Sequence, residues 1–129
     1  MAKFTYDHIH LRSPDPEATA KWYEHMFGAQ IMRTMQGGTA RIDLKLGGMD
    51  IFIAPVPPGG AVNPPPVTPY QGLDHFGLSV TGIDAVVAEL KAKGAEFTME
   101  LNEIRPGVRI CFVRGPQGVS IEVLERKAS

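Results

Sequence analysis

The sequence is poor in several features that would point to particular classes of protein. Cys111 is the only cysteine among 129 residues, which excludes an intramolecular disulfide and a cluster of thiolate metal ligands. There is no apolar run of the roughly 18 residues that a membrane span needs, and the first residues lack a signal-peptide core. Charge is nearly balanced, with 13 basic and 14 acidic residues and no basic run, so nucleic acid and membrane are not expected partners. We therefore expect a soluble, cytoplasmic protein.

The chain does contain an internal repeat of about half its length. The tripeptide Asp-His-Ile at residues 7–9 recurs as Asp-His-Phe at residues 74–76. The pattern that follows each tripeptide closes on Gly-Ala, at residues 28–29 and 94–95. A repeat on this scale predicts two copies of one supersecondary unit, with a histidine at the same position in each copy.

Each copy has the pattern of a strand, a helix and then three strands. In the first copy Asp15 is the expected N-cap of the helix and Gly28 its end. In the second copy Thr81 or Asp84 is the expected N-cap, and Gly94 ends the helix. The predicted strands cover residues 3–12, 30–35, 39–46 and 49–54 in the first copy, and 73–80, 96–103, 107–114 and 119–125 in the second.

We expect a single α+β domain over residues 1–129, with module 1 at residues 3–55 and module 2 at residues 71–126. The linker at residues 55–70 is rich in proline, which cannot pair inside a sheet and favours an extended, polyproline II-like conformation. We interpret it as a stiff surface crossover. A flap over the active site and the hinge of a subunit exchange are the alternatives.

Three strands carry polar residues that share one face. Because side chains alternate along a strand, His8, His75 and Glu122 lie opposite the apolar face of their strands, which the helices are expected to cover. Two neutral imidazoles and a carboxylate suit a divalent first-row metal with open coordination positions. Each residue alone is more often a solvated strand residue, but the repeat favours a metal site. His10 is the rival ligand, although Gly77 holds its equivalent position.

Together these motifs resemble the vicinal oxygen chelate superfamily, which includes glyoxalase I, extradiol dioxygenases and the fosfomycin- and bleomycin-resistance proteins. The resemblance rests on Asp7-His8 with Trp22-Tyr23 and Gly28, on Asp74-His75 with Leu90 and Gly94, and on the run FVRGPQGVSIEVLE at residues 112–125. It implies two βαβββ modules that form an open, curved mixed sheet with helices on the outer face. It also implies one divalent metal ion (Zn, Ni, Mn or Fe), a small-molecule substrate and a homodimer.

The chain is most similar to bacterial glyoxalase I. In that family an arginine four residues after the first histidine helps to bind glutathione, and Arg12 holds this place; His10 and Phe52 are further candidates for substrate contact. The fourth metal ligand of the family is a glutamate at the position of Phe52, so this carboxylate is missing. Asp50 and Asp43 are the candidate replacements.

The function that the resemblance implies is that of a metal-dependent lyase or isomerase of the glyoxalase type. It would act on a small oxygen-chelating substrate through an enediolate-like intermediate, with Glu122 as the general base, a role worth about 10²–10⁴-fold in rate. The alternatives are an extradiol ring-cleaving dioxygenase with two histidines and one carboxylate on Fe(II), and a non-catalytic protein that binds a drug or metabolite. Cys111, in an apolar strand without an activating neighbour, is not expected to be catalytic.

Overall fold

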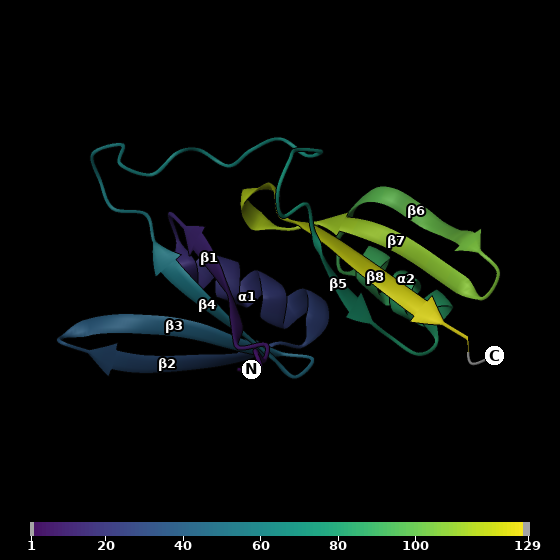
Figure 1. The fold of residues 1–129 in the computed structure, drawn as a ribbon, viewed down its shortest axis with the longest axis horizontal. Coiled ribbons are helices and arrows are strands. Elements are labelled where there is room, and N and C mark those ends of the chain that lie inside the picture. Colours follow the sequence, from purple (N-terminus) through teal and green to yellow (C-terminus); the bar gives the residue numbers. More distant parts are fainter. Residues whose placement is uncertain (1, 128–129) are drawn as a thin grey trace. The chain divides into compact units, whose positions relative to one another are not determined.

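The computed structural model describes residues 2–127, which form two compact units divided between Asn63 and Pro64. Each unit has the order strand, helix and three strands, and each forms its own four-stranded mixed sheet (Figure 1). The predicted α+β class with two βαβββ modules is therefore confirmed. Neither helix in the described part of the chain has the length and apolar character of a membrane span.

The first unit places one helix against one face of its sheet. Strand β1 pairs in parallel with β4, and the remaining neighbours are antiparallel, in the order β1-β4-β3-β2. Tyr23 of the helix and Leu44 and Ile51 of the central strands are fully buried between these layers. The elements are β1 (His8–Ser13), α1 (Pro16–Phe27), β2 (Gln30–Gln36), β3 (Thr39–Leu46) and β4 (Met49–Pro55).

The second unit repeats this topology in the order β5-β8-β7-β6. Ile83 and Leu90 of its helix are buried, as are Ile121 and Val123 of the adjacent strand β8. The elements are β5 (Phe76–Ser79), α2 (Ile83–Ala92), β6 (Glu96–Arg105), β7 (Val108–Arg114), a short 3-10 helix (Pro116–Gly118) and β8 (Ser120–Arg126). Residues 56–75, which contain no helix or strand, connect β4 to β5.

Helix α1 begins and ends where the local sequence predicts. The side chain of Asp15 accepts a hydrogen bond from the backbone N–H of Ala18, which caps the first turn. The buried hydroxyl of Thr19 donates to the hydroxyl oxygen of Ser13 over 2.7 Å, joining the helix to the end of β1. Gly28 ends the helix in the left-handed region, with φ of 71°.

Helix α2 is capped differently from the prediction. Its N-cap is Gly82, at φ of 76°, and no side chain of Thr81 or Asp84 caps it. Instead, the carboxylate of Glu125 on β8 accepts hydrogen bonds from the backbone N–H groups of Gly82 and of the next residue, over 2.8 and 3.2 Å. Asp84 accepts two hydrogen bonds from Arg109. The predicted caps were wrong because a carboxylate distant in sequence satisfies these donors.

Two strands also begin later than predicted. The strand expected from Lys3 begins at His8, and the strand expected from Leu73 begins at Phe76. Strand β4 begins at Met49, and His8 pairs with the residue after it, so the residues before His8 have almost no strand to pair with. Strand propensity alone did not reveal this limit, because it is set by the length of the neighbouring strand.

Candidate functional site

The second unit brings two of the predicted metal ligands together. His75 immediately precedes β5, and Glu122 lies on the neighbouring strand β8. His75 Nε2 is 2.9 Å from Glu122 Oε1, and both side chains are partly buried. The ring of Phe112, which pairs with Glu122 in the register, lies edge-on to the imidazole at 4.9 Å between centroids. The geometry therefore gives one imidazole nitrogen and one carboxylate oxygen at a shared point on the sheet.

The other nitrogen of His75 is held by Asp74. The carboxylate oxygen Oδ2 lies 2.8 Å from His75 Nδ1. The hydrogen bond to Asp74 raises the pKa of His75, and the bond to Glu122 adds to this effect against the opposing cost of burial. A carboxylate that accepts the Nδ1 proton of a neutral imidazole leaves the lone pair on Nε2, the nitrogen that faces Glu122.

The first unit repeats this arrangement at His8. Asp7 Oδ2 lies 2.6 Å from His8 Nδ1, so a carboxylate from the preceding residue holds the same nitrogen in both units. The His8 ring stacks on Phe52 at 4.1 Å between centroids, with 27° between the planes. Its Nε2 has no hydrogen-bond partner among residues 2–127. The repeated Asp-His sequence was the available signal for Asp7 and Asp74, but sequence analysis did not assign them this positioning role.

Each sheet carries an aromatic residue next to a carboxylate on the face away from its helix, but the two residue types are interchanged between the units. Strand β8 is equivalent to β4, and β7 to β3. The second unit has the carboxylate on β8 and the aromatic ring on β7, whereas the first has the ring on β4 and the carboxylate on β3. The rows are Gly77–Glu122–Phe112 and His10–Phe52–Asp43. The register thus places Phe52 at the position equivalent to Glu122, as the sequence count predicted.

Each candidate for the fourth ligand is hydrogen-bonded to a basic side chain and not to a histidine. Asp50 Oδ1 accepts a hydrogen bond from Lys45 over 2.7 Å. Asp43 Oδ2 accepts one from Arg41 Nε over 2.9 Å, and its other oxygen is buried without a partner in the described chain. Within either unit, residues 2–127 contain no group of three His, Cys, Asp or Glu side chains that could hold a metal.

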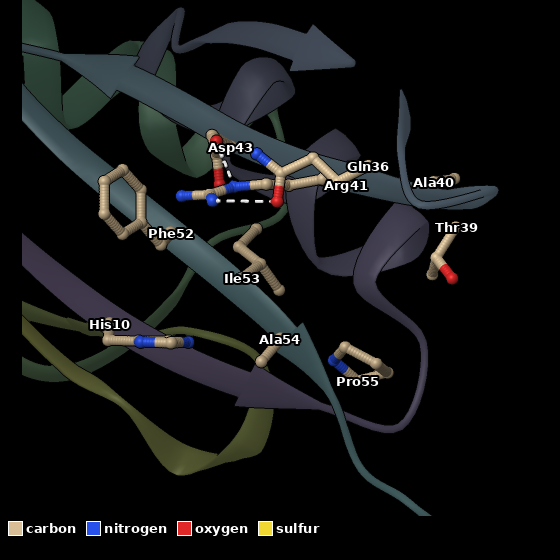
Figure 2. Close-up of a pocket in the computed structure, with 10 residues that line it drawn as sticks. All are labelled: His10, Gln36, Thr39, Ala40, Arg41, Asp43, Phe52, Ile53, Ala54 and Pro55. Atoms are coloured by element: carbon tan, nitrogen blue, oxygen red, sulfur yellow. Dashed lines mark hydrogen bonds and ion pairs between the residues drawn. The ribbon is translucent and has the colours of Figure 1, made fainter. Parts of the chain in front are cut away.

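A cavity of about 260 Å³ opens on the first unit between β1, β4 and the β2–β3 hairpin (Figure 2). Two of the predicted substrate residues, His10 and Phe52, line it, whereas Arg12 is exposed and does not. The guanidinium of Arg41 lies 4.6 Å from the Phe52 ring centroid and is hydrogen-bonded to Asp43. Arg41 was not among the predicted site residues, although it has the same strand parity as Asp43 and so shares its face.

Cys111 does not belong to either site. It is fully buried on β7, and burial raises the pKa of its thiol. A raised pKa lowers the fraction of reactive thiolate at neutral pH. These properties are those of a small core residue.

The family model of the Glyoxalase/Bleomycin resistance protein/Dioxygenase superfamily matches residues 5–123, and the chain belongs to this superfamily. The protein YwkD of Bacillus subtilis, described as uncharacterized, is 28% identical over 125 residues, covering 92% of this chain and 94% of that protein. Lactoylglutathione lyase of Haemophilus influenzae is 25% identical over 132 residues, covering 95% and 93%. A glyoxylase/bleomycin resistance protein/dioxygenase domain from Frankia has the same fold, with a TM-score of 0.76, 22% identity and coverage of 99% and 96%.

Proposed function

We propose that the protein is a metal-dependent lyase or isomerase of the glyoxalase type that acts on a small oxygen-chelating substrate. The observation that carries this proposal is the Asp74–His75–Glu122 arrangement, in which a partly buried imidazole is held by one carboxylate and aimed at another. The similarity to lactoylglutathione lyase over nearly the whole of both chains supports the same class of reaction.

The residues of the second unit fit a divalent ion. Donors roughly 2.1 Å from one ion lie roughly 3.0–3.4 Å apart at octahedral to tetrahedral angles. His75 Nε2 and Glu122 Oε1 are 2.9 Å apart, so a small separation of the two atoms satisfies this geometry. The carboxylate of Asp74 on the other imidazole nitrogen is the usual outer partner of a metal-binding histidine. We propose His8, whose Nδ1 is held by Asp7 in the same way, as the third ligand.

Zn, Ni, Mn and Fe(II) all suit this mixed nitrogen and oxygen set, and the bound ion would supply Lewis-acid stabilisation of negative charge on substrate oxygens. Glu122 would move the proton: its carboxylate takes a proton from a carbon next to a substrate carbonyl and returns it to the neighbouring atom. Asp74 fixes His75 at Nδ1, which would keep the lone pair of Nε2 available to the ion beside Glu122. His10 and Phe52 would contact the substrate from the cavity wall, and Arg12 would bind an anionic end of it.

The aromatic residue at the position equivalent to Glu122 favours a second candidate. With Phe52 there, the assigned set is two histidines and one carboxylate, the facial triad typical of non-haem Fe(II) oxygenases. An extradiol ring-cleaving dioxygenase is therefore the alternative activity. A non-catalytic protein that binds a drug or metabolite is the alternative without chemistry.

Reconstitution of the metal-free protein separates these functions. The protein is loaded in turn with Zn, Ni, Mn and Fe(II), then assayed with the methylglyoxal–glutathione adduct and, for Fe(II), with catechols and oxygen. We expect turnover of the adduct that is lost in Glu122→Gln and retained in His25→Ala, a control on the exposed face of α1. Catechol cleavage would replace the lyase by the dioxygenase. Metal binding without any turnover would leave the binding protein.

A further inference from the structure

The cavity of the first unit combines a fixed cation with apolar walls. We propose that it is a subsite for a small planar organic acid, an aromatic or conjugated carboxylate whose carboxylate binds Arg41 and whose plane packs beside Phe52. The inference deepens the proposed function, on which it rests for the role of this acid as substrate, because His10 of the cavity wall lies beside His8. Binding of the acid itself requires only the first unit.

Arg41 is held in place before any ligand arrives. Its Nε donates to Asp43 over 2.9 Å, its Nη1 makes a longer contact of 3.4 Å with Gln36, and its guanidinium carbon lies 4.6 Å from the Phe52 centroid. The side chain is 35% exposed, so part of it remains accessible to a ligand. A guanidinium that is already ordered loses little further rotamer freedom when it forms hydrogen bonds.

The contact with Asp43 leaves an edge of the guanidinium for a ligand. Asp43 engages Nε through a single oxygen, and Nη2 has no acceptor among the described residues. The edge formed by Nη1 and Nη2 therefore carries donors whose only protein acceptor is the distant Gln36 oxygen. Two parallel N–H groups of a guanidinium match the two oxygens of a carboxylate.

The remaining walls favour a flat and largely apolar body. Figure 2 shows Phe52, His10, Ala54 and Pro55 around the part of the cavity that faces β1 and β4. The rings of His10 and Phe52 stand nearly perpendicular, at 82°, and because His8 stacks on the Phe52 ring and Arg41 lies over it, Phe52 offers its edge to a planar ligand. The volume of about 260 Å³ lies below the roughly 300–1,000 Å³ of pockets for drug-sized ligands, which favours a small acid.

The test is a titration of the full-length, metal-free protein with benzoate, followed by the shifts of backbone amide signals. We expect shifts at residues 39–41 and 52–55, and a weakening of at least about tenfold in Arg41→Gln, since hydrogen bonds to charged groups are among the stronger ones. Arg41→Lys, which keeps the charge but not the fork, should recover only part of the affinity. Arg33→Gln is the matched control, since Arg33 is an exposed arginine on β2 that pairs with Glu17.

Neutral benzamide tests the contribution of the carboxylate, and non-planar cyclohexanecarboxylate, which should also bind more weakly than benzoate, tests the contribution of the planar body. Benzamide should bind at least about tenfold more weakly than benzoate because it cannot form the charged pair. Equal binding of benzoate and benzamide, an equal loss in Arg33→Gln, or no shift at the cavity would overturn the subsite. Benzoate binding by a protein that takes up none of Zn, Ni, Mn and Fe(II) on reconstitution would keep the subsite and refute the proposed function. Metal-dependent turnover without benzoate binding would keep the proposed function and refute the subsite.

Discussion

Asp74 provides the most specific consequence of the proposed metal site. Removing its carboxylate by Asp74→Ala should weaken divalent-metal binding, although Asp74 is not itself a proposed ligand. The carboxylate accepts from His75 Nδ1 at 2.8 Å and fixes the tautomer that presents Nε2 to the ion. Loss of such an outer partner typically reduces metal affinity by about 10–100-fold.

The exposure of the pair decides where in this range the effect should fall. The side chains of His75 and Asp74 are 32% and 46% exposed, so water replaces part of the lost hydrogen bond. We therefore expect about a tenfold loss for Asp74→Ala, or about 1.4 kcal/mol of binding free energy. Asp74→Asn keeps a neutral acceptor in the same place and should lose less, because charge-assisted hydrogen bonds are roughly twice as strong as neutral ones.

Calorimetric titration of the metal-free proteins with Zn²⁺ and Ni²⁺ measures these differences directly. Asp84→Asn is the matched control, because it changes an aspartate of the same unit that is hydrogen-bonded to Arg109 and not to His75. The order of affinity should be wild type and control, then Asp74→Asn, then Asp74→Ala. Equal affinities in all four proteins would refute the positioning role, provided that His75→Ala removes binding.

Three further predictions concern the folded chain and its assembly. Hydrogen bonds from the N–H groups of Gly82 and its neighbour lower the pKa of Glu125, so its stabilising effect is present above the unfolded value of about 4.3 and is lost as pH falls through the folded value. Glu125→Gln should thus lower Tm at pH 7 and lower it less as the pH falls below about 4.3, and an equal loss at pH 7 and pH 3 would contradict the cap. Tyr23 is fully buried, and its hydroxyl has no partner in the described chain, so Tyr23→Phe should raise the unfolding free energy in urea by about 1 kcal/mol; a comparable loss would reveal a partner. If two subunits share each metal site, refolding His8→Ala together with His75→Ala should restore metal binding, since one site of the mixed dimer keeps every ligand. Continued absence of binding would indicate ligands from a single chain.

The sequence predicted most of the fold because its signals are local. Alternation along the strands, Asp15 at one helix start and Gly28 at its end act over a few residues and appear where expected. The cap of α2 was missed because its donor and acceptor groups, at Gly82 and Glu125, are 43 residues apart. No local pattern reports such a contact, which exists only once β5 and β8 are paired.

In the candidate site, too, local sequence patterns predicted some features, and contacts between distant parts of the chain determined the others. Strand parity predicted that His75 and Glu122 share a face, but the 2.9 Å contact follows from the pairing of β5 with β8. Parity would also place Arg41 and Asp43 together, yet the cavity beside Phe52 depends on the register of three strands. Residue types and periodicity thus predicted the candidate ligands, whereas the cavity required the three-dimensional pairing of the chain.

The central claim is that His75 and Glu122 bind a divalent metal together with His8. Elemental analysis of the purified protein, and of the metal-free protein after reconstitution, tests it most directly. The account predicts one divalent ion per chain, lost in His8→Ala, His75→Ala and Glu122→Gln and retained in the His25→Ala control. Retention of the ion by folded His75→Ala and Glu122→Gln proteins, or failure of the wild-type protein to bind Zn, Ni, Mn or Fe(II), would contradict it.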